Sequence, residues 1–334
     1  MTTTAQVQRP DIDEHRALLE DVGLFDRSER GKLSVTGDEA GEFLDSLLSN
    51  DVKSLAEGAG CYATLLTHKG RLLADVRVLR TAAEGIWLDS ERPGLQALFD
   101  ALTQFRIGYR AELHKQTLQR GLLSLIGPGS DRVVGAGLGA EEHANVGAAI
   151  GGVDVLAVRT DVGIDLICPS EETAELRSAL EAGGAVPVGE ATVECLRVER
   201  GRPRFGVDMD ETTMPQEAAI NGRAVSYTKG CYVGQETVAR LYWKGKPNRH
   251  LRGLRLSAEA PPGAVLRLGE TEVGVLGTVA VSPTLGPIAL ALVRRAAGPG
   301  DVLGVGEDGS VSATVTELPL APGAPARPPT DGPG

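Results

Sequence analysis

The segment KGCYVGQE (Lys229–Glu236) combines residue types that favour a reactive thiol. Cys231 stands two residues after Lys229 and just before GQETVARLYW, a stretch that predicts a helix. A thiol beside an ammonium group and the positive end of a helix dipole has a lowered pKa and a larger thiolate fraction. Cys231 is therefore a candidate nucleophile or redox-sensitive ligand. A small buried cysteine at a tight turn is the alternative, and spacing alone does not decide between them.

The chain is locally basic after this segment. Seven lysines and arginines but one carboxylate, Glu236, lie between positions 229 and 255, in a protein whose formal net charge is −11. Arginine binds carboxylates bidentately, so the run suits an anionic small molecule such as one with a glutamate tail. Lys229 and Arg240 are candidate ligand-binding residues in this run. A solvated basic face is the alternative.

Length and composition exclude several classes of protein. A chain of 334 residues predicts two or three domains whose cores need no disulfide or metal. An aromatic content of 4% and an acidic net charge argue against nucleic-acid binding. The four cysteines form no CxxC pair and no histidine has zinc-site spacing, so we expect no metal site. The sequence lacks an N-terminal signal pattern and a long apolar run, which predicts a cytoplasmic protein with no membrane partner.

The pattern of elements predicts an α+β fold. LSVTG predicts a strand leading into a helix capped by Asp38, and the runs CYATLLT and LLADVRVLR predict a hairpin with Asp75 in its second strand. TVECLRVERG predicts a helix that carries Glu199. Short strands rich in Gly and Pro beyond Arg252 predict a small C-terminal β-barrel. The predicted segments are an N-terminal region (1–126), a central region (127–250), the barrel (251–318) and a disordered tail (319–334).

Several longer stretches resemble a known family. KGCYVGQETVARLYWKG resembles the signature of the YgfZ family, the folate-binding relatives of the glycine-cleavage T-protein, an aminomethyltransferase. GLFDRSERGKLSVTGDEAGEFLDSLLSNDV, HKGRLLADVRV, LRVERGRPRFGVDMDETTMPQEA and VGVLGTVAVSPTLGPIALALV resemble other parts of the T-protein superfamily. The resemblance implies a multidomain T-protein-like fold around a central channel that holds tetrahydrofolate.

The resemblance also implies roles for two carboxylates. Asp75 matches an acidic residue that contacts the reactive end of the folate, and Glu199 matches a glutamate that holds the pterin ring. Without the resemblance, both residues would be interpreted as surface charges. T-proteins have no cysteine at the position of Cys231, and many YgfZ relatives lack the acid matched by Asp75. The sequence thus combines a YgfZ motif with part of a T-protein site.

Two functions follow from this combination. The first is a tetrahydrofolate-binding accessory protein that assists assembly or repair of iron–sulfur clusters, with client enzymes or assembly factors as partners and Cys231 as the central residue. The second is a folate-dependent aminomethyltransferase or demethylase, in which Asp75 is catalytic. The cysteine motif favours the first function, and Asp75 supports the second. The sequence does not decide whether the protein is an enzyme.

Overall fold

The computed structural model describes residues 7, 9–81, 85–135, 137–307 and 309–321. The chain divides into two compact units, each assembled from segments that are distant in the sequence. The first unit contains residues 1–15, 189–222 and 236–334, and the second contains residues 16–188 and 223–235. The segment boundaries expected from the sequence stay a prediction, and most of the expected tail, residues 322–334, lies outside the described residues. None of the described helices is both long and apolar enough to span a membrane.

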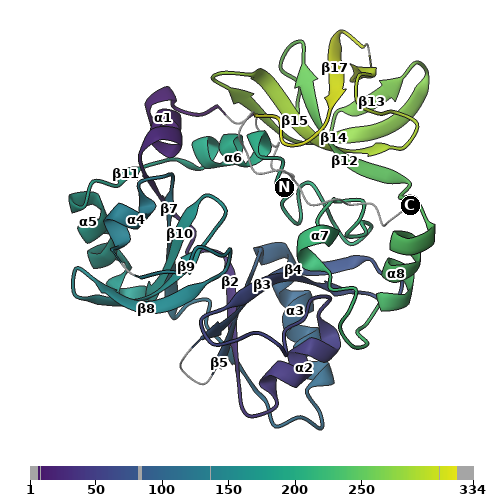
Figure 1. The fold of residues 1–334 in the computed structure, drawn as a ribbon. Helices are drawn as coiled ribbons and strands as arrows, with labels where there is room; N and C mark the ends of the chain where they lie inside the picture. The colour runs from purple at the N-terminus through teal and green to yellow at the C-terminus, as the bar shows by residue number, and fades with distance from the viewer. Residues whose placement is uncertain (1–6, 8, 82–84, 136, 308, 322–334) are drawn as a thin grey trace. The chain divides into compact units, whose positions relative to one another are not determined.

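The second unit contains a five-stranded antiparallel sheet, with strand order β3-β4-β5-β2-β6 (Figure 1). The hairpin expected around HKGR is confirmed: it is formed by β3 and β4, and Gly70 in its turn has a φ of 72°. The strands are β3 (Gly60–Leu66), β4 (Leu72–Thr81), β5 (Gly85–Ser90), β2 (Gly31–Thr36) and β6 (Glu112–Lys115).

The two faces of this sheet differ because successive side chains on a strand alternate. One face, with Ala63, Val76 and Leu88, packs against the helices α2 (Ala40–Leu47) and α3 (Arg92–Phe105) in an apolar core. Helix α2 begins at Ala40 with Glu39 at its N-cap, so the expectation that Asp38 caps it was wrong. The opposite face is largely polar yet buried, and it carries the charged residues described below.

A six-stranded sheet with the order β11-β1-β7-β10-β9-β8 forms the rest of the second unit. Its apolar core includes residues from α4 (Ser130–Val134) and α5 (Thr173–Ala182), and a short 3-10 helix (Ser170–Glu172) precedes α5. Strands β9 and β10 form an antiparallel hairpin. The strands are β11 (Val186–Pro187), β1 (Gly23–Asp26), β7 (Arg120–Ile126), β10 (Gly163–Pro169), β9 (Val153–Arg159) and β8 (Asn145–Ile150).

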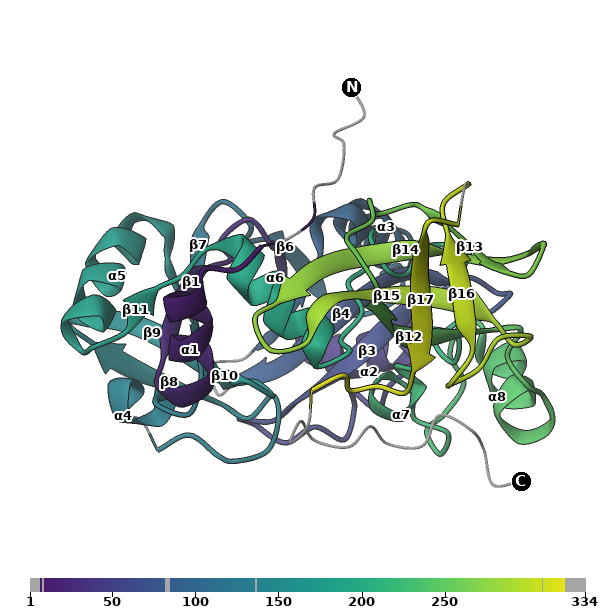
Figure 2. The ribbon, with the colours of Figure 1, turned by 90° about the horizontal axis from the view of Figure 1, so that it is seen from above.

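The first unit contains a closed six-stranded barrel, which confirms the barrel expected beyond Arg252 (Figures 1 and 2). Helix α6 (Glu190–Glu199) packs against strands β14 and β15 of the barrel. In order around the barrel the strands are β12 (Arg249–Leu256), β15 (Gly286–Arg294), β14 (Thr271–Ser282), β13 (Val265–Leu268), β16 (Val302–Val305) and β17 (Val311–Thr316). The remaining helices are α1 (Ile12–Glu20), α7 (Asn221–Ala224) and α8 (Gln235–Lys244).

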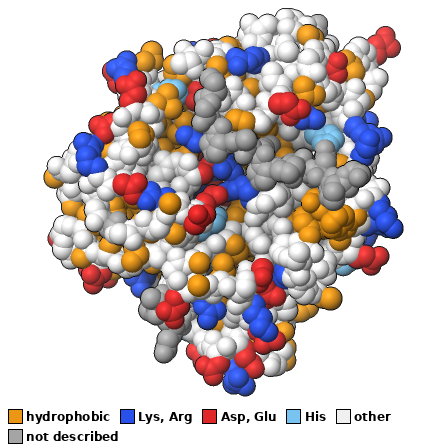
Figure 3. All heavy atoms as spheres, in the orientation of Figure 1, with side chains coloured by type: hydrophobic (Ala, Val, Ile, Leu, Met, Phe, Trp, Pro, Cys, Tyr) orange, Lys and Arg blue, Asp and Glu red, His pale blue; other side chains and the backbone are white. Residues whose placement is uncertain are grey.

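Charged side chains of both signs mix on the surface. On the face drawn in Figure 3, acidic and basic groups are interspersed rather than separated into large areas of one sign. The absence of nucleic-acid binding expected from the composition stays a prediction.

Arg77 on β4 joins the two sheets of the second unit. Its Nε lies 2.6 Å from Asp89 on β5, and its Nη1 lies 2.6 Å from Asp165 on β10. All three side chains are buried. Buried charges are tolerated only when they are paired, so this ion-pair bridge fixes how the two sheets face each other.

We predict that Arg77→Met lowers the free energy of unfolding by about 3–5 kcal/mol, because it leaves two buried carboxylates without their shared cation. Urea unfolding would measure the loss. Arg110→Met is the control, since Arg110 is 72% exposed beside Asp38 and Glu39 and such a surface pair contributes at most about 1 kcal/mol. Equal losses in the two variants would contradict the role given to Arg77.

Candidate functional site

Asp75 is buried on the polar face of the five-stranded sheet, beside Tyr62. The hairpin register places Thr64 opposite Asp75 and Tyr62 opposite Arg77, so these side chains share one face. The Tyr62 hydroxyl donates a hydrogen bond to Asp75 Oδ2 at 2.8 Å. Asp75 Oδ1 is also buried, and it has no hydrogen-bond partner within the described part of the chain. Buried polar atoms are nearly always paired, so this oxygen is suited to accept a hydrogen bond from a ligand.

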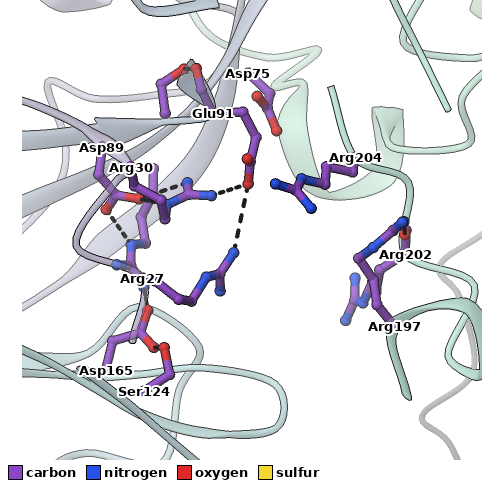
Figure 4. Close-up of polar contacts among 12 residues, drawn as sticks. Arg27, Arg30, Asp75, Asp89, Glu91, Ser124, Asp165, Arg197, Arg202 and Arg204 are labelled. Atoms are coloured by element: carbon purple, nitrogen blue, oxygen red, sulfur yellow. Dashed lines mark hydrogen bonds and ion pairs between the residues drawn. The ribbon is translucent and has the colours of Figure 1, made fainter. Parts of the chain in front are cut away.

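A network of ion pairs lies next to Asp75 (Figure 4). Arg30 bonds to Asp89 at 2.7 Å and also to Glu91, and Arg27 lies 3.6 Å from Glu91. The Arg77 bridge extends the network to Asp165, whose carboxylate also accepts a hydrogen bond from Ser124 at 2.6 Å. Three arginines thus balance three carboxylates, Asp89, Glu91 and Asp165, while Asp75 is held by the Tyr62 hydroxyl.

Burial and the negative charge of Glu91 together raise the pKa of Asp75 to about 6, against the opposing effects of Arg30 and of the Tyr62 hydrogen bond. By contrast, the pKa of Asp165 is lowered, since Arg77 and Arg27 outweigh the effect of its burial. These two buried carboxylates therefore differ in character. Asp75 can take up and release a proton near neutral pH, which is what a general acid or base requires.

The observed contacts of Lys229, in the motif segment, are structural. Its ammonium donates to the carbonyl oxygens of Asp45, Leu48 (2.9 Å) and Asn50 (3.3 Å), at and just beyond the C-terminal end of α2. Its side chain is 1% exposed and pairs with the Asp45 carboxylate at 3.3 Å. A cation at a helix C-terminus satisfies carbonyls that have no partner in the helix. The ligand-binding role expected for Lys229 stays a prediction.

Gly234 holds the motif segment against the turn between β3 and β4. Its φ of 85° lies in the left-handed region, and a Cβ added there would lie 2.5 Å from the carbonyl oxygen of Thr67. Cys231, three residues earlier, is exposed, whereas Cys168 and Cys195 are buried and Cys61 is half-buried. Burial raises the pKa of the Cys61 thiol to about 12. Cys231 is thus the accessible thiol among the four.

The basic run after the motif is only partly available to a ligand. Arg249 donates to both carboxylate oxygens of Glu217, at 3.2 and 2.9 Å, and Arg252 pairs with Glu317 at 2.8 Å. Arg240 on α8 is exposed, as are Lys244 and Lys246. An anion-binding role for this run therefore depends on Arg240 and its two exposed neighbours, and it stays a prediction.

Glu199 lies at the end of α6 in a closed polar cluster. Its carboxylate accepts hydrogen bonds from Ser282 at 2.6 Å and from the Cys195 thiol at 3.7 Å, and it lies 3.2 Å from His15 Nε2. Burial alone would raise the pKa of Glu199, but the bonds from His15, Ser282 and Cys195 outweigh it and keep the pKa below its usual value. Without the family resemblance, Glu199 was expected to be an exposed helix residue. That expectation was wrong, because Glu199 is 2% exposed.

Asp75, Lys229 and Cys231 belong to the second unit, whereas Glu199 and Arg240 belong to the first. Sequence reasoning missed Tyr62, the hydrogen-bond donor to Asp75, and Arg223, whose guanidinium lies 5.1 Å from the centre of the Tyr62 ring. The hairpin register could have identified Tyr62, because β3 residues of even number share the face of Asp75. Arg223 gave no such signal, because α7 is far from β3 in the sequence.

Comparison with known proteins gives a consistent result. Residues 3–229 match the family model described as the GCVT N-terminal domain. An aminomethyltransferase from Streptomyces coelicolor is 30% identical over 315 residues, covering 89% of this chain and 84% of the relative. A putative chloroplastic transferase from Arabidopsis thaliana is 28% identical, covering 89% of this chain and 71% of the relative.

Among solved structures, the glycine cleavage system aminomethyltransferase T from Bartonella henselae matches with a TM-score of 0.81 at 26% identity. The match covers 93% of this chain and 89% of that one. The α+β, T-protein-like fold with a C-terminal barrel, expected from the sequence, is thereby confirmed.

We predict that Asp75→Asn stabilises the protein above pH 6. Because the folded-state pKa of Asp75 is about 6 and the ordinary value is 3.8, ionisation of this carboxyl costs the folded state about 2–3 kcal/mol. This cost is absent near pH 4 and complete by about pH 8, and the neutral amide avoids it. Denaturant unfolding of both proteins across this range would measure the difference. A difference that does not change with pH would contradict the raised pKa.

We predict that Gly234→Ala destabilises the protein more than Gly263→Ala does. The two glycines have similar φ values, 85° and 82°, but a Cβ at Gly263 would have no neighbour within 4 Å. Gly263→Ala is therefore expected to cost only the backbone strain, about 1 kcal/mol of stability. Gly234→Ala adds the clash with Thr67 to this strain, for a total loss of about 2–4 kcal/mol. Thermal unfolding would separate the two contributions. Equal melting temperatures would show that the motif segment does not depend on this contact.

Proposed function

The chain belongs to the GCVT family, and from this membership we propose that it transfers a one-carbon unit from an aminomethyl donor to tetrahydrofolate. The observation that carries the proposal is Asp75, a buried strand carboxylate with a pKa of about 6 and one oxygen that no described residue partners. Relatives named aminomethyltransferase favour this function over the iron–sulfur role.

The proposed chemistry is balanced without an oxidant. The donor carbon is a methylene group bonded to a carrier atom and to an amine, and the product is methylene-tetrahydrofolate. The two folate nitrogens each form a bond to this carbon and lose one proton, while the carrier and ammonia leave and take up those protons. Asp75 would accept a hydrogen bond from a folate N–H at Oδ1 and move a proton between the folate and the departing amine. Tyr62 would hold Oδ2 and keep the carboxylate oriented.

A pterin contact by Glu199 would compete with hydrogen bonds that its carboxylate already makes. Both oxygens of its carboxylate already lie within hydrogen-bond distance of His15, and one of them also accepts a bond from Ser282. A pterin would have to replace some of these bonds. The proposal therefore rests on Asp75, with Glu199 and Arg240 as the expected contacts of the pterin and of an anionic tail.

We predict that Asp75→Asn lowers the rate of methylene-tetrahydrofolate formation by about 10²–10⁴-fold, the usual contribution of a positioned acid or base. Mass spectrometry of the folate products, after incubation with tetrahydrofolate and aminomethyl donors, would measure the rate. Asp154→Asn is the control, because Asp154 is an exposed strand aspartate on β9. A wild-type rate in Asp75→Asn, or no product from the wild-type protein, would overturn the proposal.

A second function rests on a different residue. Cys231 is exposed in the KGCYVGQE motif, and Lys229 and Gly234 fix the segment on both sides of it. This arrangement supports the YgfZ-like role, in which a folate-binding protein assists iron–sulfur cluster assembly or repair in client enzymes. An exposed thiol next to an anchored loop is accessible to a partner protein.

For this second function, we predict that Cys231→Ser does not restore iron–sulfur enzyme activity in a strain that lacks the protein. Serine keeps the size and hydrogen bonding of the side chain but removes the thiolate. Activities of several iron–sulfur enzymes in the complemented strain would measure rescue, with Cys168→Ser as the control. Full rescue by Cys231→Ser would exclude a role for this sulfur.

A further inference from the structure

Arg223 lies over the ring of the tyrosine that holds Asp75. Its guanidinium carbon is 5.1 Å from the centre of the Tyr62 ring, and the Tyr62 hydroxyl donates to Asp75 Oδ2 at 2.8 Å. All three residues belong to the second unit. The negative face of an aromatic ring attracts a cation, so the guanidinium favours one orientation of the ring. Arg223 thus contacts the residue that orients Asp75, although it takes no part in the proton transfer described above.

The backbone of Arg223 is fixed beside β3 by a side-chain amide. Asn50 Nδ2 donates to the carbonyl oxygen of Tyr62 at 2.8 Å and to that of Arg223 at 2.9 Å. The hydroxyl of Ser49, the preceding residue, donates to the carbonyl oxygen of Ala224 at 2.6 Å. One short segment therefore binds the strand that carries Tyr62 and the segment that carries Arg223, and it sets the distance between them.

The side chain of Arg223 is held by Glu142, in the loop before β8. Arg223 Nη2 pairs with the Glu142 carboxylate, and both side chains are partly buried. His143 Nε2 lies 3.9 Å from the same carboxylate, but burial lowers the pKa of His143 to about 4. The imidazole is therefore neutral near pH 7. Within the described part of the chain, Arg223 is the cation that balances Glu142, and Glu142 keeps the guanidinium in place over the ring.

The charges around Tyr62 keep its hydroxyl protonated. Burial and the negative charge of Asp75 raise the pKa of Tyr62 well above its ordinary value, and Arg223 and Arg30 oppose this only in part. Tyr62 therefore stays a hydrogen-bond donor to Asp75. Around Asp75 itself, Glu91 raises the pKa of the carboxyl, while Arg30 and the bond from Tyr62 lower it. A hydrogen bond favours the ionised carboxyl only while its geometry is kept, so a looser Tyr62 ring would raise the pKa of Asp75.

We propose that Arg223 is a positioning residue for the one-carbon transfer, which holds the Tyr62 ring so that its hydroxyl orients the Asp75 carboxylate, and that Glu142 holds Arg223 for this role. The inference rests on the proposed function, because it gives Arg223 an effect on the rate only if Asp75 moves the proton. The positioning itself has a readout that needs no activity.

The first test is the titration of Asp75 in the full chain, labelled with carbon-13 at the aspartate carboxyl groups and followed by NMR. The signal of Asp75 is the one that Asp75→Asn lacks. We expect Arg223→Met to titrate about one pH unit higher than wild type, because the bond from Tyr62 is weakened, and Tyr62→Phe to titrate at least as high. The double variant should titrate like Tyr62→Phe, since Arg223 acts through Tyr62.

Arg132→Met is the matched control, because Arg132 pairs with Asp21 at the surface of the same unit and is 62% exposed; it should titrate like wild type. Glu142→Gln covers the case in which Arg223→Met fails to fold, and it should move the titration in the same direction by a smaller amount. A wild-type titration in Arg223→Met or in Glu142→Gln would overturn the proposal. So would a further rise in the double variant, which would show that Arg223 acts on Asp75 directly.

The second test is the rate of methylene-tetrahydrofolate formation by the same variants. We expect Arg223→Met to lower kcat about tenfold in the wild-type background and to have no further effect in the Tyr62→Phe background. A general loss of structure would lower the rate by the same factor in both backgrounds, and that result would overturn the positioning role. No product from the wild-type protein would count against one-carbon transfer by Asp75, and the titration would still decide whether Arg223 positions Tyr62.

Discussion

Charge balance on the buried face of the five-stranded sheet is the constraint on which the second unit depends. Strand alternation buries one row of charged side chains between the two sheets, and each charge in that row needs a partner. Arg77 supplies the partner for carboxylates from both sheets, so one residue contributes both to the packing of the sheets and to the balance of charge. Asp75 shares this face but is held by a neutral hydroxyl. Burial on this face, together with the nearby charge of Glu91, therefore raises the pKa of Asp75.

The KGCYVGQE motif is fixed by contacts that are unrelated to thiol chemistry. Lys229 is buried against the end of α2, and Gly234 allows close approach to the β3–β4 turn. Two of the most recognisable residues of the motif thus have structural explanations of their own. The described contacts give no structural explanation for Cys231, which lies between them. Its exposure is therefore better evidence for a chemical role than its position in the sequence.

The elements could be predicted from the sequence because their signals are local. The alternation in β3 and β4, with Gly70 in the turn, indicated the hairpin that carries Asp75, and the short Gly-rich strands indicated the barrel. The partners of the charged residues could not be predicted in this way. Arg77 meets Asp165 across 88 positions, and Lys229 meets Leu48 across 181, so only the tertiary fold determines that these cations are buried and paired. The same applies to Glu199, whose helix was predicted but whose burial was not.

The interleaving of the two units has a consequence for synthesis on the ribosome. The second unit includes residues 223–235, so it cannot be completed until a segment that follows the whole of α6 has left the exit tunnel. The first unit begins with the N-terminal residues but needs the barrel, which emerges last. Residues 1–15 must therefore wait for almost the whole chain, and during translation His15 lacks the partners that bury it in the finished protein. Co-translational folding of this protein is expected to complete the second unit first.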